Sequence, residues 1–164
     1  MARYAEDTTV SIKQSRADVE SLVERYGARK FAFGYDGDKG IATVLFELHD
    51  RRVQFRLRMP EKHKFDYTPT GKSRATSARD RAWEQECRRL WRSLVLVLKA
   101  KLEAVASGVE TFEEAFLAQI VLPDGRTYGD VAIPQIGHVY ETRQMPPMLP
   151  GVDPSVLALG RGQA

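Results

Sequence analysis

Residues 42–59, Ala-Thr-Val-Leu-Phe-Glu-Leu-His-Asp-Arg-Arg-Val-Gln-Phe-Arg-Leu-Arg-Met, contain two runs in which apolar side chains occupy every second position. A period of two predicts strands that turn one face to a core and the other to solvent. His49-Asp50 separates the runs and predicts a turn. A third alternating run over 31–35 precedes them, joined by the turn residues 36–40. We therefore expect a three-stranded antiparallel meander.

A long amphipathic helix follows in the sequence. From Trp83 to Val105 apolar residues recur at helical spacing, and Ser77 is the expected N-cap. The two tryptophans, Trp83 and Trp91, bracket the apolar stripe, so we expect both in the core. Cys87 lies on the same stripe and is expected to be a buried, unreactive thiol.

Shorter elements flank these two. Ser15 has the position of an N-cap for a helix over about 16–26. Thr111 has the same position before a second short helix, and Pro134 places the start of a last helix near itself. The proline- and glycine-rich residues 145–164 predict an irregular arm and a frayed tail.

Together these elements predict an α+β fold in which a small three-stranded antiparallel sheet packs on one long amphipathic helix, with shorter flanking helices. The length of 164 residues, with 43% hydrophobic and 29% charged residues, suits one globular domain, expected over residues 1–144. No apolar run reaches the roughly 18 residues that cross a bilayer, so no membrane association is expected. A single cysteine and the lack of an apolar leader favour a cytoplasmic location.

Charge is unevenly distributed along the chain. Residues 51–101 hold 15 of the 25 Lys and Arg residues but only 5 of the 22 Asp and Glu residues. A concentrated basic segment favours a polyanionic partner, with nucleic acid, DNA or RNA, as the first candidate.

Within this segment, one set of cations lies on the third strand. Arg52, Arg56 and Arg58 are expected on its outward face, at roughly 6 to 7 Å spacing. That spacing is close to the distance between phosphates in an extended nucleic-acid strand. The alternative is an edge strand that carries charge to avoid pairing with other chains.

A second set belongs to residues 60–76, expected to be a loop because of two prolines, a glycine and no periodicity. Basic and aromatic side chains alternate in it. These are Lys62, Lys64, Phe65, Tyr67, Lys72 and Arg74. Cations bind a phosphate backbone and aromatic rings stack on unpaired bases. The alternative is that the two aromatics attach the loop to the core.

A third set lies on the long helix. Arg81, Arg88, Arg92 and Lys99 fall near one azimuth and form a straight basic row, about 120° from the centre of the apolar stripe. The row is either a phosphate-contacting surface or a solvated helix face.

No catalytic or cofactor motif accompanies these cations. The chain has no phosphate-binding glycine loop, no nucleophile elbow and no zinc-protease motif, so neither an enzyme nor a cofactor is expected. A metal-dependent nuclease stays open as a hypothesis. It requires several acidic turn residues to converge. These are Asp36, Asp38, Asp124 and Asp130.

Several segments resemble a family of small uncharacterised proteins of phage, prophage and mobile elements. The matching segments are Met1-Ala-Arg-Tyr-Ala, Trp83-Glu-Gln with Cys87-Arg88, Trp91-Arg92, residues 99–105, Thr111-Phe-Glu, Phe116-Leu-Ala, residues 120–125, and Met145-Pro-Pro with Leu149-Pro-Gly. The family has no assigned active site. The resemblance implies a setting in which small basic proteins handle nucleic acid or counter host defences.

The sequence therefore predicts a non-catalytic nucleic-acid-binding accessory protein that contacts the phosphate backbone without sequence preference. Stacking on Phe65 and Tyr67 would favour single strands. The alternative is a protein-interaction factor, such as an anti-defence protein that binds a host or phage protein.

Overall fold

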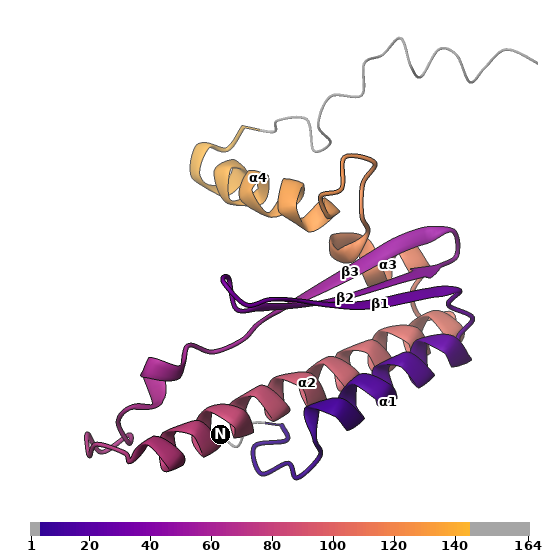
Figure 1. Ribbon diagram of the computed structural model, residues 1–164. Coiled ribbons are helices and arrows are strands. Elements are labelled where there is room, and N and C mark those ends of the chain that lie inside the picture. Colours follow the sequence, from indigo (N-terminus) through magenta and orange to yellow (C-terminus); the bar gives the residue numbers. More distant parts are fainter. Residues whose placement is uncertain (1–3, 145–164) are drawn as a thin grey trace, which may run out of the picture.

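The computed structural model describes residues 4–144, and its sheet is the predicted antiparallel meander (Figure 1). Strands β1 (Lys30–Asp36), β2 (Ile41–Leu48) and β3 (Arg51–Arg58) are ordered β1-β2-β3. His49 and Asp50 both have positive φ angles, 50° and 57°, in the turn between β2 and β3. Such a turn twists in the sense that a two-residue hairpin needs.

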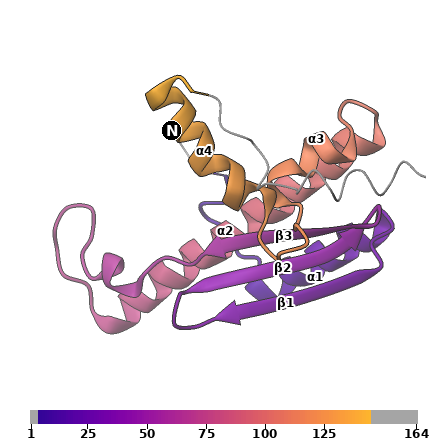
Figure 2. The ribbon, with the colours of Figure 1, turned by 90° about the horizontal axis from the view of Figure 1, so that it is seen from above.

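Two helices cover one face of this sheet. α1 (Ile12–Arg25) and α2 (Thr76–Ala106) lie side by side beneath it (Figures 1 and 2). Val44 and Phe46 of the sheet pack in one cluster with Leu98 of α2 and Val19 of α1. The predicted packing of the sheet on one long amphipathic helix is confirmed, and α1 completes the same layer.

The segments after α2 close one end of the core and reach the other side of the sheet. In α3 (Phe112–Phe116), the Phe116 ring meets Phe46 edge-to-face, with 6.2 Å between ring centroids. After the short helix η2 (Leu117–Gln119), the Val121 amide donates to the Arg52 carbonyl at 2.8 Å. This segment therefore covers part of the free edge of β3, and α4 (Tyr128–Thr142) follows on the outer side (Figure 1).

Three helix starts differ from the sequence prediction. α1 is capped by Ser11, whose hydroxyl accepts from the Gln14 amide at 3.1 Å, and Ser15 is buried inside the helix. The earlier cap adds a turn that places Ile12 against the core. α2 begins at Thr76 with no side-chain cap, so Ser77 is not its N-cap.

The last helix begins six residues before Pro134. Thr127 and Asp130 form a capping box, because the Thr127 hydroxyl accepts from the Asp130 amide and the Asp130 carboxylate accepts from the Thr127 amide. Burial of Val131 and Ala132 adds to the capping and offsets the cost of a proline inside the helix.

Two further predictions concern local features. Residues 60–75 contain a short helix, η1 (Lys62–Phe65), and a bridge between Tyr67 and Ser73, so the segment has more order than a loop. Cys87 is buried as expected, and burial raises its pKa to about 11. The expected arm over 145–164 lies outside the described residues.

Gly129 of α4 lies close against η2. A Cβ atom at this position would lie 2.7 Å from the Ala118 carbonyl oxygen, closer than any side chain tolerates. Gly137, two turns later in α4, has no atom within 4 Å of the same hypothetical Cβ. The two glycines lie in the same helix and differ in whether a Cβ atom fits, so substitution of one is a control for substitution of the other.

We expect Gly129→Ala to lower the free energy of unfolding by about 1 to 2 kcal/mol, because α4 must shift away from η2. Gly137→Ala should raise it by about 0.5 to 1 kcal/mol, since alanine costs less backbone entropy in a helix. Urea denaturation of the two variants and the wild type measures both changes. Equal shifts in the same direction would contradict the close contact.

Candidate nucleic-acid interface

The two basic rows of the sequence lie on different layers of the fold. Arg52, Arg56 and Arg58 point away from α2, because their neighbours Val53 and Phe55 fill the core face of β3. The row on α2 lies on the other side of the sheet, where Arg92 reaches Asp18 of α1 at the helix–helix groove. The strand and helix rows therefore do not share a face.

The fold also pairs many of these cations with carboxylates. Arg88 binds Glu84 one turn earlier in α2, and Arg92 binds Asp18. A side-chain hydrogen bond from Gln14, together with Arg92, holds the pKa of Asp18 below its ordinary value. The paired cations of residues 51–101 are Arg51, Arg56, Lys62, Lys64, Arg79, Arg88, Arg89 and Arg92.

Arg56 of β3 forms an ion pair that connects two elements of the fold. Its guanidinium donates to the Asp130 carboxylate, so the ion pair joins β3 to the capping box of α4. The hydrogen bond from Arg56, with those from Thr127, lowers the pKa of Asp130 to about 2. Arg56 thus holds α4 over the outer face of the sheet.

Of the side chains that follow β3, some form contacts within the fold and others are exposed. The Arg74 guanidinium donates to the carbonyls of Phe65 and Tyr67, at 3.1 and 2.7 Å, and so closes the turn that follows η1. Phe65 is half-buried, whereas Tyr67 is 63% exposed. Lys72 forms no ion pair among residues 4–144, and Arg81 donates to the Ser77 carbonyl.

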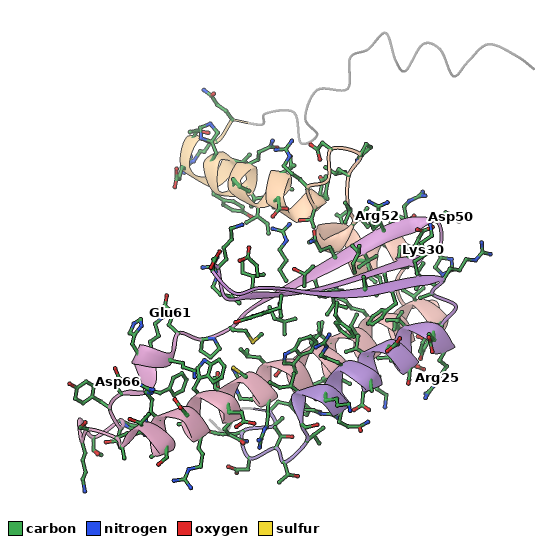
Figure 3. The ribbon with its side chains drawn as sticks, viewed as in Figure 1. Arg25, Lys30, Asp50, Arg52, Glu61 and Asp66 are labelled. Atoms are coloured by element: carbon green, nitrogen blue, oxygen red, sulfur yellow. The ribbon has the colours of Figure 1, made fainter. Side chains whose placement is uncertain are left out.

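A cleft of about 910 Å³ gathers three of the predicted cations with residues that the sequence did not indicate. It lies where the β1–β2 turn, the end of β3, η1 and α2 meet. Arg58, Lys62 and Lys64 line it, and Lys39 joins them from the turn. Arg52 lies at the opposite end of the sheet from Glu61, which marks the cleft (Figure 3).

Two aromatic rings form part of the cleft wall. Tyr35 is 64% exposed at the end of β1, and Trp83 is half-buried on α2. The Trp83 indole N–H donates to the Pro60 carbonyl at 2.6 Å, and the Lys62 ammonium lies 4.6 Å from the ring centroid. Trp83 is therefore held by a hydrogen bond and a cation–π contact.

Cations outnumber carboxylates in this cleft. Asp38 and Glu61 are the acidic residues of its lining, and Glu61 is engaged by Lys64 at 3.3 Å. Arg58 forms no ion pair with any residue of the described chain. The cleft thus combines an unpaired guanidinium and three ammonium groups with aromatic surface, which suits an anion with flat rings.

The aspartates of the nuclease hypothesis do not form a metal site in the part of the chain that the structure describes. No group of three or more His, Cys, Asp or Glu side chains there is placed to hold an ion. Asp36 binds Lys39, Asp124 binds Arg126 and Asp130 binds Arg56. Asp36 and Asp124 therefore stabilise their own turns, and Asp130 stabilises the start of α4.

Comparisons with known proteins give no relative: no family model matches the chain, and no curated protein or solved structure is significantly similar to it. Among residues 4–144, no helix has both the length and the apolar content needed to cross a membrane.

The Arg56–Asp130 pair makes stability depend on pH in a known direction. Since the folded pKa of about 2 lies below the ordinary 3.8, the contribution is complete above about pH 4 and is lost as pH falls toward 2. The Asp130 side chain is 34% exposed, so solvent screening reduces the contribution to about 1 kcal/mol.

We expect the wild type to lose about 1 kcal/mol more than Asp130→Asn between pH 5 and pH 2.5, because only the wild type has this carboxylate to protonate. Urea denaturation at both pH values measures the difference. Other paired carboxylates are common to both proteins and cancel. Parallel losses would show that the ion pair does not stabilise the fold.

Proposed function

We propose that this protein is a non-catalytic accessory protein that binds nucleic acid through the phosphate backbone, with a preference for single strands. The observation that carries the proposal is the cleft at the end of the sheet. There, cations from three separate segments of the chain converge beside the exposed Tyr35 ring and the half-buried Trp83 ring. Backbone contacts of this kind are tolerant of sequence and sensitive to salt.

Arg58, Lys62, Lys64 and Lys39 are the phosphate contacts in this proposal. They are preferred to the longer row that the sequence predicted because they line one cleft, which Arg56, Arg88 and Arg92 do not. Arg58 forms no ion pair among the described residues, whereas Lys39, Lys62 and Lys64 would exchange exposed ion pairs with Asp36, Asp80 and Glu61 for phosphate contacts, at a small cost.

Surface beyond the cleft extends the same chemistry. Tyr67 is exposed and Lys72 forms no ion pair among the described residues, and both lie on the turn after η1. This turn is at the same end of the molecule as the cleft, near Asp66 (Figure 3). A strand leaving the cleft would meet a third aromatic ring there, which favours single-stranded over duplex partners.

The cellular setting belongs to the proposal as well. A phage or mobile-element origin rests on the resemblance of segments such as Trp83-Glu-Gln and residues 99–105 to that family. A cytoplasmic location rests on the single, buried Cys87, which suits a reducing compartment.

A second candidate, a protein-interaction factor, is favoured by the surface of α4. Ile133, Ile136 and Tyr140 follow the spacing of one helix face and are 64%, 44% and 83% exposed. Contiguous exposed apolar side chains of this kind often mark contacts with another protein. A stoichiometric protein recovered after nuclease treatment, and lost with Ile136→Asp, would favour this candidate.

Charge reversal in the cleft tests the leading proposal. We expect Arg58→Glu with Lys62→Glu to weaken binding to labelled single-stranded DNA or RNA at least tenfold. The slope of log K against log salt should become shallower by about 1.4, since two phosphate contacts are lost. Fluorescence anisotropy between about 50 and 200 mM salt measures both quantities.

A matched control carries the same change of charge outside the cleft. Arg52→Glu with Lys99→Glu alters one residue at the far end of the sheet and one exposed residue of α2. This variant should bind with nearly wild-type affinity. If both variants bound equally weakly, binding would depend on net charge alone, and the cleft would not be the interface.

A further inference from the structure

A second, apolar pocket lies directly behind the cleft. Its volume is about 340 Å³, at the lower end of the range for small-molecule sites. α1 contributes Ile12, β1 contributes Phe33, the residue after β3 is Met59, and α2 contributes Cys87 and both tryptophans. Met59, Cys87 and Trp91 of this lining also belong to the core cluster, so the pocket borders the sheet–helix core.

The pocket and the cleft share one wall. Tyr35, Met59 and Trp83 line both of them. A ligand can therefore occupy the two together, with its anionic part among Arg58 and Lys62 and its apolar part behind Trp83. A nucleotide has these two parts, because it carries a charged phosphate at one end and a flat base at the other.

The pocket wall on α1 carries a polar group that suits a base. The Arg16 guanidinium lies 4.3 Å from the Phe33 ring centroid and 6.0 Å from that of Trp91. A base buried between rings still presents ring nitrogens and carbonyl oxygens at its edge, and a guanidinium donates to such acceptors.

We propose that this pocket receives one unpaired base of a strand whose phosphates lie in the cleft. The inference rests on the proposed function, and it adds the mode of recognition. The base stacks against the half-buried Trp83, with its polar edge toward Arg16 beside Phe33. Duplexes cannot bind in this way without extruding a base, so the pocket gives the single-strand preference its physical cause.

Tryptophan emission reports on the pocket directly, because the chain has two tryptophans and both line it. A single-stranded oligothymidine should quench this emission in the same titration in which anisotropy shows binding. A strand of the same length built from abasic sites keeps the phosphates but has no bases. It should bind about tenfold more weakly and leave the emission unchanged.

Cys87→Met fills the pocket with a larger apolar side chain and leaves both tryptophans in place. We expect this variant to bind oligothymidine and the abasic strand with equal affinity and without quenching. Leu98→Met introduces the same residue in the core of the same helix, outside the pocket. It should behave as the wild type does.

Tyr35→Ala gives a second variant that does not depend on core packing, since this side chain is exposed at the rim. It should lose part of the preference for oligothymidine over the abasic strand. The wild type could bind both strands with equal, salt-dependent affinity and show no change in emission. That result would overturn the proposal that the pocket binds a base, and it would leave the proposed function standing. Absence of binding to either strand at low salt would overturn both.

Discussion

The difference in length between α2 and the sheet determines most of the remaining structure. α2 has 31 residues and extends about 46 Å, whereas strands of eight residues extend about 26 Å. The sheet can therefore cover only part of the helix. At one end α3 and η2 pack beside the core, and at the other end the N-terminal part of α2 extends beyond the strands (Figures 1 and 2). The cleft and the apolar pocket are the consequence of that overhang.

The same geometry explains why charge along the sequence differs from charge on the surface. Carboxylates from outside the basic segment, Asp18, Glu113 and Asp130, pair with cations within it. Each pair joins two elements of the fold, α1 to α2, α3 to the start of β3, and α4 to β3. Arg58, at the last position of β3, shares the cleft with Asp38 and Glu61 but forms an ion pair with neither.

The strands were predictable because the alternation of apolar and polar side chains depends only on which face of the sheet meets the core. Helix starts were less so, since Ser11 and Ser15 both fit a cap and only the packing of Ile12 favours the first. The azimuth of Trp83 correctly places it on the apolar side of α2. It cannot show that the sheet stops before this residue, and so the half-buried ring in the cleft wall was missed. Tyr35 and Lys39 were missed for the same reason, because only the folded hairpin brings them to α2.

Trp83 connects the electrostatic and the apolar parts of the candidate site. The Pro60 carbonyl fixes its indole N–H and Lys62 lies against its ring, so its orientation is set before any ligand arrives. This residue lines both the basic cleft and the apolar pocket. A rigid shared wall costs little side-chain entropy on binding. A ligand that satisfies both sides therefore gains from the second contact at little further ordering cost, which is the condition under which weak phosphate and base contacts combine into one site.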